Sequence, residues 1–413
     1  MTLPLERLAE SLPRIRDEAL FERTRAVERR ANALSALRAA SDVEAVTQRV
    51  EDAITSWLVA VPLEPPTTRH PRPPSPGVYT ILAVDGSHAE LDRFAATSCA
   101  VINLGGWRIQ YGRNAQAELL RDLRVLTSQD LDCAERDDAS RVEMLSGQPL
   151  GALRTVEELR FLEQAAAEAL SEPDSHPVVG LLDGSLVLWS VSTRTQAARR
   201  RIIDEGVIPA LNKLRQLAQL YPFAFCGYIS HPGSTEVVNM LRVQPNVCYR
   251  PSNDRVECQR CEQRADDGSR PCDLVAINDR ALFAALLAPG ERSAAFRSVS
   301  KNKDSVQNQS YEPAGHAVAF CYVRVGVDEV ARLEFPLWLA AQPGALDLLH
   351  AAVLDQCERG PGYPIALQEA HELAVLTGPD RMTIERLIED ALQASGVPTS
   401  VAGKRGSKRW RMI

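Results

Sequence analysis

Long apolar runs are missing from this 413-residue sequence. No stretch approaches the ~18 consecutive apolar residues of a membrane-spanning helix, so we expect no transmembrane segment. An excess of basic residues is missing too: the net charge is -7 and the pI is about 5.7, so any polyanion must bind to a local basic cluster. The N-terminal stretch carries acidic residues and no continuous apolar core, which is not the pattern of a signal peptide. We therefore expect a soluble cytoplasmic protein.

Glycine and strand-like alternation are both absent from residues 3 to about 60. The segment is rich in Ala, Leu, Glu and Arg, with apolar residues at helical spacing, which predicts an N-terminal helical region at 1–61. Pro13 interrupts the pattern early, and Ser41-Asp42 is typical of a cap that starts a second helix over 43–61. These helices either pack on their own domain or contact a partner or a second protomer, and the sequence leaves both open.

Proline is concentrated in "PLEPPTTRHPRPPSPG", residues 62–77, which predicts an extended linker. A single domain is expected over 78–413, where strand and helix patterns are mixed. The predicted class is α/β, with a mixed sheet flanked by helices. The expected strands are 78–84, 97–104, 107–111, 178–183, 186–191, 223–229, 316–325 and 330–336, and the expected helices are 115–123, 154–171, 194–219, 234–242, 278–287, 343–357, 364–376 and 381–394.

The tripeptide Asp-Gly-Ser follows a buried-strand pattern twice, after "YTILAV" and after "PVVGLL". We expect Asp85 and Asp183 to be held at the rim of a sheet, where Gly86 and Gly184 let the chain turn sharply. Two neighbouring carboxylates repel each other unless a cation lies between them, and hard oxygen ligands suit Mg²⁺ or Mn²⁺. Ordinary turn chemistry explains one copy, whereas two copies after buried strands favour a metal site.

A third carboxylate is expected from the helix over 154–171, whose apolar face runs from Val156 to Leu170. Glu163 falls at the edge of that face, and Glu158 falls well away from its centre. A carboxylate on the packed side of a helix is costly unless it is paired or bound to metal. Glu163 is therefore the expected third ligand, with Glu158 in reserve.

Near the end, "GYPIALQEAHELAVL" predicts a turn followed by a helix with Pro364 at its first position. Tyr363 and His371 are eight residues apart, and His371 lies just over two turns into that helix. A histidine on an apolar helix is more often a core residue than a catalytic one. The alternatives are a ligand to a second metal ion or an acid/base group.

Four cysteines lie within an otherwise polar segment of about residues 246–274, at C-x₉-C-x₂-C-x₁₀-C spacing. Cys248, Cys258, Cys261 and Cys272 are typical of a structural zinc site in a Cys-rich insertion, and four thiolates are also compatible with an iron–sulfur cluster. We expect zinc. The alternative is four free cysteines, or a pair with two bystanders.

The C-terminal "GKRGSKRWRMI" holds the densest basic cluster of the chain, including Lys404, Arg405, Lys408 and Arg409. A basic terminus is often only solvated. The cluster otherwise predicts contact with a phosphate backbone, and so DNA binding.

The ordered set of motifs resembles the NurA nuclease family over about residues 78–410. The motifs are "AVDGSHAELDRF", "INLGGWRIQYG", "LLDGSLVLW", "GYISHPGSTEVVNMLR", "GERSAAF", "ARLEFPLW" and "GYPIALQEAHELAV". The resemblance implies an RNase H-like core, a homodimer and a manganese- or magnesium-dependent DNase with 5′-to-3′ exonuclease and endonuclease activity. It further implies work with HerA, a hexameric ATPase that translocates DNA, in end resection for double-strand break repair. The Cys-rich insertion is not required by the minimal family pattern.

The same resemblance implies roles for individual residues. Asp85 and Asp183 match the two aspartates of the family, and Glu163 fits its helical glutamate best. Tyr363 and His371 match its tyrosine and histidine, including their separation. These residues are expected to hold two metal ions and to position a water molecule and the scissile phosphate.

Alternative functions stay open beside the nuclease. One is a catalytically silent member of the same fold that serves as a DNA- or translocase-binding platform. Another is a phosphotransferase with Asp85 as its nucleophile. Arg292 in "GERS" and Arg332 in "ARLEF" are expected to pair with carboxylates, or else to stabilise the bound strand.

Overall fold

The computed structural model describes residues 5–91, 99–134, 142–172, 176–192, 194–248, 256–258, 260–261 and 263–397. The chain forms two compact units, which are described separately. Unit 1 comprises Met1–Arg72, Ile229–Lys303 and Ala319–Leu333, and unit 2 comprises Pro73–Tyr228, Asp304–Val318 and Glu334–Ile413. The first boundary falls inside the predicted linker, but unit 1 also takes in two later segments.

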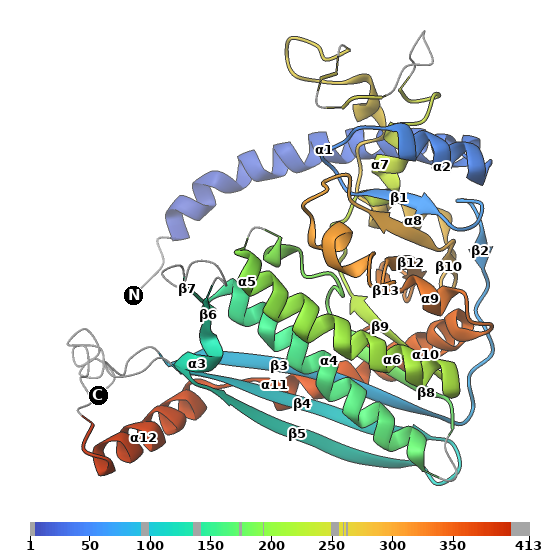
Figure 1. Ribbon diagram of the computed structural model, residues 1–413. Helices are drawn as coiled ribbons and strands as arrows, with labels where there is room; N and C mark the ends of the chain where they lie inside the picture. Colours follow the sequence, from blue (N-terminus) through green and yellow to red (C-terminus); the bar gives the residue numbers. More distant parts are fainter. Residues whose placement is uncertain are drawn as a thin grey trace. The chain divides into compact units, whose positions relative to one another are not determined.

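Unit 2 is built on a mixed sheet with the strand order β9-β8-β3-β4-β5 (Figure 1). Strands β3, β4 and β5 pair antiparallel, whereas β8 and β9 run parallel to β3. Their bounds are Tyr79–Glu90, Ala100–Tyr111, Gln116–Leu126, Val178–Asp183 and Phe223–Ile229 for β3, β4, β5, β8 and β9. The apolar β8 is buried along its length up to Leu182, as expected for a central strand of a sheet covered on both faces.

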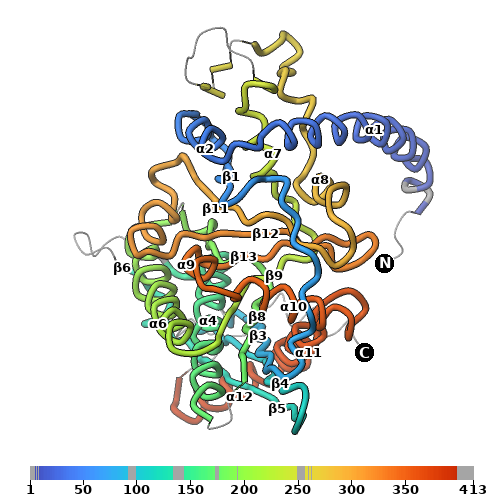
Figure 2. The backbone as a smooth tube through the Cα atoms, turned by 90° about the vertical axis from the view of Figure 1, so that its right-hand side faces the viewer, coloured from blue at the N-terminus to red at the C-terminus, as the bar shows by residue number. Residues whose placement is uncertain are grey.

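Helices cover this sheet. Helix α4 (Gln148–Ser171) packs on β3 and β8, and α6 (Ile208–Leu220) packs on α4. Helix α11 (Ile365–Ala374) packs on β3 and β4, beside α10 (Ala345–Arg359) (Figure 2). The remaining elements of unit 2 are α3 (Ser128–Leu131), β6 (Asp132–Ala134), β7 (Val142–Met144), η1 (Trp189–Val191), α5 (Gln196–Arg199), η2 (Arg200–Val207), η4 (Gln307–Tyr311), α9 (Leu337–Ala340) and α12 (Gly378–Ala394).

Some predicted elements of unit 2 were wrong. The helix expected over 115–123 is strand β5, which pairs with β4 from Ala100↔Leu126 to Gln110↔Gln116. The strand expected over 186–191 is a turn followed by η1. The two strands expected over 97–104 and 107–111 are, in the described residues, the single strand β4.

Unit 1 combines helices with a smaller set of strands. Helix α1 (Leu5–Ala39) contains Pro13 without ending there. Helix α2 (Val43–Asp52) is capped by Asp42, whose carboxylate accepts hydrogen bonds from the backbone N–H groups of Glu44 and Ala45, as the sequence predicted. The helix ends at Asp52 and not near 61, because the chain continues as strand β1 (Val59–Pro62).

Strand β1 pairs antiparallel with β11 (Phe296–Val299), which pairs with β12 (Val318–Arg324). The short β10 (Arg292–Ser293) pairs with β12 and with β2 (Arg69–His70), so part of the predicted linker lies in a strand. The other elements are α7 (Glu236–Arg242), η3 (Pro271–Val275), α8 (Asp279–Leu286) and β13 (Val330–Pro336), whose last three residues belong to unit 2.

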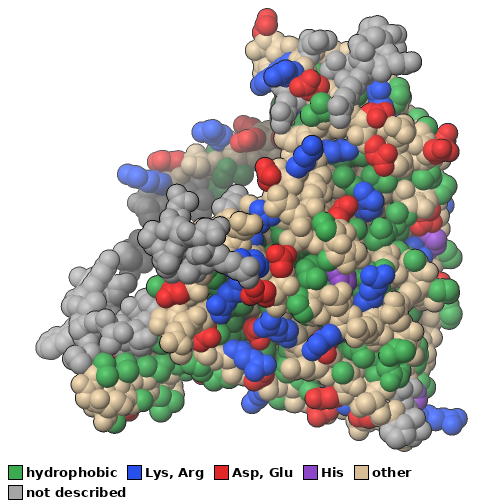
Figure 3. Space-filling view, viewed as in Figure 1, with side chains coloured by type: hydrophobic (Ala, Val, Ile, Leu, Met, Phe, Trp, Pro, Cys, Tyr) green, Lys and Arg blue, Asp and Glu red, His purple; other side chains and the backbone are tan. Residues whose placement is uncertain are grey.

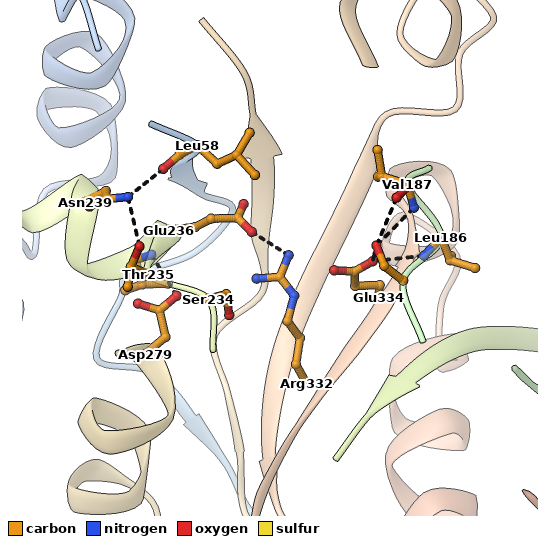
Figure 4. A network of polar contacts seen from close by, with 12 residues as sticks. Leu58, Leu186, Val187, Ser234, Thr235, Glu236, Asn239, Asp279, Arg332 and Glu334 are labelled. Atoms are coloured by element: carbon orange, nitrogen blue, oxygen red, sulfur yellow. Dashed lines mark hydrogen bonds and ion pairs between the residues drawn. The ribbon is translucent and has the colours of Figure 1, made fainter. Parts of the chain in front are cut away.

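A buried polar network stabilises unit 1 (left side of Figure 4). The Nη2 atom of Arg332 lies 2.7 Å from Oε1 of Glu236, and its guanidinium lies over the Phe320 ring. Arg292 lies 4.0 Å from Glu64. Both arginines therefore form the ion pairs predicted from the sequence. The buried Arg332–Glu236 pair is costly to break, because removing one partner leaves an uncompensated charge.

A second network lies in unit 2, on the chain that leaves β8 (right side of Figure 4). The Oε2 atom of Glu334 accepts hydrogen bonds from Ser185 Oγ at 2.8 Å and from Leu186 N at 3.0 Å. The hydroxyl of Tyr311 donates to Leu186 O at 2.9 Å. These bonds fix the backbone that follows Asp183. Within the described part of the chain, no helix is long and apolar enough to cross a membrane.

Candidate active site

Asp85 and Asp183 lie side by side on neighbouring strands. The parallel register pairs Val84 of β3 with Leu182 of β8, so each aspartate is the next residue along its strand. Strand β8 ends at Asp183, which is partly accessible to solvent, whereas β3 continues past a buried Asp85 to Glu90. The sequence correctly predicted that the two carboxylates meet, but it wrongly predicted that β3 ends at the first of them.

Asp85 is paired with His371. The Nδ1 atom of His371 lies 2.7 Å from Oδ2 of Asp85, and the other carboxylate oxygen accepts a hydrogen bond from Gly86 N. An ionised Asp85 only accepts hydrogen bonds, so a neutral His371 paired with it would carry its proton on Nδ1 and present the lone pair of Nε2. The His371 side chain is 60% exposed, so this lone pair is within reach of solvent or substrate.

A glycine on β4 allows α11 to bring His371 this close. Gly105 is the cross-strand partner of Asp85, and a Cβ added there would lie 2.7 Å from Ala374 N and from Leu373 Cβ. Asn103, two residues earlier on β4, donates to Leu373 O at 3.1 Å and to Ala374 O at 2.8 Å. The end of α11 is therefore held against the sheet by contacts that a larger residue at position 105 would block.

Glu158 of α4 is the carboxylate that lies near the two aspartates. It is buried, and burial raises its pKa to about 8, with the charges of Asp85 and Asp183 adding to the shift and Arg154 opposing it. Its Oε1 lies 3.0 Å from Nε of Arg154. A Cβ at Gly86 would come within 2.8 Å of that same oxygen, so the glycine leaves room for Glu158 against β3.

Glu163, the expected third ligand, is placed elsewhere. Its Oε2 pairs with Nζ of Lys213 on α6 at 3.1 Å, in a surface hollow also lined by Glu157 and Arg160. Five residues along a helix turn the side chain by roughly 140°, so Glu158 and Glu163 cannot both face β3. Around this hollow, acidic and basic side chains are interspersed over α4 and α6 (Figure 3). Glu158, the second choice from the sequence, therefore takes the place expected for Glu163 as the third carboxylate of the site.

Tyr363 contacts the other aspartate. Its hydroxyl donates a hydrogen bond to Asp183, and burial, followed by the negative charge of Asp183, raises the pKa of Tyr363 well above its ordinary value. The ring packs edge-on against Tyr228, with centroids 5.4 Å apart. Partial burial and the charge of Asp85 raise the pKa of Asp183, whereas the Tyr363 hydroxyl lowers it. Tyr363 is thus a neutral donor at the rim of the site.

The donor set fits a hard divalent cation. Its three carboxylates are oxygen ligands of the type that Mg²⁺ and Mn²⁺ take in proteins. Burial, with the charges of Asp85 and Asp183 added to it, raises the pKa of Glu158, so the three carboxyl groups act on one another electrostatically. As the side chains stand, however, no three His, Cys, Asp or Glu residues of the described chain form a ready metal cluster.

The four cysteines of the predicted insertion form no disulfide with the described residues, and three of them lie near one another. Burial raises the pKa of Cys258 to about 11, and nearby Cys248 and Cys272 add to the shift. Together with Cys261 these thiols form no ready metal cluster within the described residues, so zinc and iron–sulfur both stay predictions. The predicted DNA-binding residues Lys404, Arg405, Lys408 and Arg409 lie outside the described residues.

The fold and the site indicate a class of enzyme, and a comparison with known proteins identifies the family. A mixed α/β fold that gathers three carboxylates, a histidine and a tyrosine beside two neighbouring strands is an arrangement suited to phosphodiester hydrolysis. A family model described as "NurA domain" matches residues 79–376, most of the chain. The protein therefore belongs to the NurA family, which is a family of nucleases.

Among solved structures, "Crystal structure of NurA with manganese" is 14% identical to this chain, with a TM-score of 0.39. It covers 92% of this chain and 98% of its own. "Crystal structure of NurA bound to dAMP and manganese" is 13% identical, covers 92% of this chain and 97% of its own, and has a TM-score of 0.40. No curated protein matches the sequence.

Proposed function

We propose that the protein is a metal-dependent DNA nuclease, acting as a 5′-to-3′ exonuclease and endonuclease. The observation that carries the proposal is the meeting of Asp85, Asp183 and Glu158 with His371 and Tyr363 in a member of the NurA family. Manganese in two solved NurA structures, one of them with dAMP, supports a metal-dependent reaction on a nucleotide substrate.

The chemistry is hydrolysis of a phosphodiester. The oxygen of water forms a bond to phosphorus, the ester P–O bond breaks, and the leaving oxygen takes up a proton. Two Mn²⁺ or Mg²⁺ ions bound by Asp85, Glu158 and Asp183 would stabilise charge on the phosphate oxygens and help to ionise the water. The protein's own residues provide the remaining functions.

Asp85 fixes the tautomer of His371, so that Nε2 either accepts the proton of the attacking water or joins the metal ligands. Tyr363, held as a neutral hydroxyl, keeps Asp183 oriented and can donate to a phosphate oxygen. The buried Glu158 excludes bulk water from the side of the site that faces α4.

The strand order of unit 2 supports an RNase H-like core. Three antiparallel strands are followed by two that run parallel to the first; β8 lies beside the first strand, β3, and β9 lies beside β8. We also propose, from the family resemblance, a homodimer that works with a HerA-type hexameric ATPase in DNA end resection and double-strand break repair.

The test is digestion of end-labelled linear DNA with Mn²⁺, with Mg²⁺ and with chelator, comparing wild type with Asp183→Ala and His371→Ala. We expect metal-dependent cleavage that falls at least ~10³-fold in both variants. Asp328→Ala, an exposed carboxylate in the turn between β12 and β13, is the matched control and should cleave like wild type. Absence of cleavage, repeated with a HerA-type ATPase and ATP, would leave the silent binding platform as the function.

A further inference from the structure

One cation lies among the carboxylates of the candidate site without having been singled out by any motif. Arg154 is one turn before Glu158 on α4, and its Nε lies 3.0 Å from Glu158 Oε1. Its Nη1 donates to Gly86 O, in the first Asp-Gly-Ser segment, at 3.2 Å. The positive charge of Arg154 also lowers the pKa of Asp183. Arg154 thus contacts Glu158 and the backbone next to Asp85, and acts electrostatically on Asp183.

The geometry leaves part of this arginine available. A guanidinium has five N–H donors, and within the described residues the contacts to Glu158 and Gly86 use only two of its nitrogens. The side chain is 33% exposed, although Glu158 beside it is buried. Gly86 is needed for this placement too, because a Cβ there would lie 3.1 Å from Cγ of Arg154.

Arg160, six residues later on α4, shows how a structural arginine on this helix is bonded. Its Nη1 pairs with Glu157 Oε1 at 2.6 Å, and its Nη2 donates to Glu205 O at 3.1 Å. Both of its terminal nitrogens are bonded within the protein, and neither contact involves the carboxylates of the site. Arg154 differs because its charge is directed at the reacting region.

An arginine suits the phosphate that such a site must accept. Its planar guanidinium binds two oxygens at once, is always protonated, and is more weakly hydrated than an ammonium group. Charge develops on the phosphate oxygens in the transition state, so a fixed cation there contributes more to the rate than to ground-state binding. If Arg154 were only the counter-ion of Glu158, its removal would instead weaken the binding of metal.

We propose that Arg154 is a catalytic residue that binds a non-bridging oxygen of the scissile phosphate and stabilises the charge that develops there. The proposal rests on the nuclease function proposed above. It adds a protein cation to the carboxylates, the histidine and the tyrosine of the site.

The experiment compares single-turnover cleavage of a short labelled DNA by wild type, Arg154→Ala, Arg154→Lys and the matched control Arg160→Ala. Arg154→Ala should cleave about 10²-fold more slowly, and Arg154→Lys should recover part of the loss. Arg160→Ala should stay close to wild type. The Mn²⁺ concentration for half-maximal rate should be unchanged in all four proteins.

Two results would overturn the proposal: equal rates for Arg154→Ala and Arg160→Ala, or a loss in Arg154→Ala that excess Mn²⁺ restores. A second arm measures binding of a 5′-phosphorylated dinucleotide by calorimetry with Ca²⁺ in place of Mn²⁺. Arg154→Ala should weaken that binding several-fold, within about tenfold, and Arg160→Ala should not. If wild type does not cleave, the proposed function fails, and this binding arm alone decides whether Arg154 is a phosphate ligand.

Discussion

At Asp85-Gly86-Ser87 the chain stays in strand β3, whereas at Asp183-Gly184-Ser185 strand β8 ends and the backbone turns. Gly184 has a φ of +104°, and a Cβ added there would meet nothing within 4 Å. Gly86 has no positive φ, and a Cβ there would meet Glu158 and Arg154. Gly184 is required by its backbone conformation, whereas Gly86 is required because its neighbours leave no space for a side chain.

The serines differ in the same way. Ser87 donates to Ala374 O at the end of α11, which helps to hold the helix that carries His371. Ser185 donates to Glu334 and fixes the chain beyond the turn. The same tripeptide therefore contacts a helix at Ser87 and stabilises a turn at Ser185. What they share is the carboxylate, which both segments place at the same point of the sheet.

Substituting the two glycines should separate these roles, with the largest effect at Gly86. In Gly86→Ala the new methyl group displaces the carboxylate of Glu158, which is the flexible end of a side chain, so the fold should tolerate it. A displacement of about 1 Å at a catalytic group can cost ~10²-fold in rate. We expect a loss of that size in metal-dependent cleavage, with the melting temperature nearly unchanged.

Gly184→Ala is the matched control, and it should show the opposite pattern. There is space for the methyl group, but a positive φ costs of order 1–3 kcal/mol for a residue with a side chain. We expect a lower melting temperature and less than about a tenfold loss of cleavage. Equal stability losses in the two variants would contradict the distinction between a spatial and a conformational glycine.

Each Asp-Gly-Ser segment also has a glycine beside it on the neighbouring strand, and for the first segment this is Gly105. We expect Gly105→Ala to reduce the cleavage rate less than Gly86→Ala does. The added Cβ would meet the backbone of α11 at Ala374, which cannot move as freely as a side-chain end. Overpacking of this kind costs about 1–3 kcal/mol. We expect that loss in chemical denaturation, together with slower cleavage as His371 moves from Asp85.

Gly227→Ala on β9 is the counterpart for the second segment, since its Cβ would overlap Gly184 O. It should lower stability at least as much, because the turn is also held by the hydrogen bond from Gly184 N to Tyr228 O at 2.9 Å. Titration with Mn²⁺ should distinguish Gly227→Ala from Gly105→Ala. We expect the Mn²⁺ affinity to fall more in Gly227→Ala, which moves Asp183, than in Gly105→Ala, which moves His371. Identical metal affinities would show that the two segments do not hold the metal differently.

The placement of the aspartates could be predicted from sequence because their strands are apolar throughout, and such strands are central neighbours in a sheet. The choice between Glu158 and Glu163 could not be made in that way. Helix α4 is buried over more than one face, so its apolar pattern does not identify the face that meets β3. The missed signal was Gly86, because a glycine within a strand often marks the close approach of another group.

Strand β5 was missed for a different reason. The segment "QAELLRDLRVL" consists largely of good helix formers with leucines at helical spacing. Its partner strand decides the outcome, since pairing along β4 satisfies its backbone and a strand fits there where a helix does not. Local propensity was overruled by a contact that only the tertiary structure reveals.

The smallest expected effect concerns the stability of the metal-free protein, and it comes from Glu158, which packs against Gly86. The pKa of Glu158 is about 8 in the fold and ordinarily 4.5, so the folded state favours the protonated form. The stability that this group contributes is fully present below pH 4.5 and is lost as pH rises towards 8. Glu158→Gln removes the titration, so in chelator at pH 8 its melting temperature should exceed that of wild type.

Below pH 4.5 the two proteins should melt alike, because wild-type Glu158 is then largely protonated in both the folded and the unfolded state, and this is the internal control. Glu163→Gln tests the specificity of the effect, since that carboxylate is paired with Lys213 and should gain nothing from neutralisation. Mn²⁺ should reverse the order at pH 8 by stabilising wild type more than Glu158→Gln. Differential scanning calorimetry with and without Mn²⁺ measures all three effects. A melting temperature of Glu158→Gln that stays below wild type in chelator at pH 8 would mean that Arg154 compensates the buried charge fully, and the site would then not need a metal to be stable.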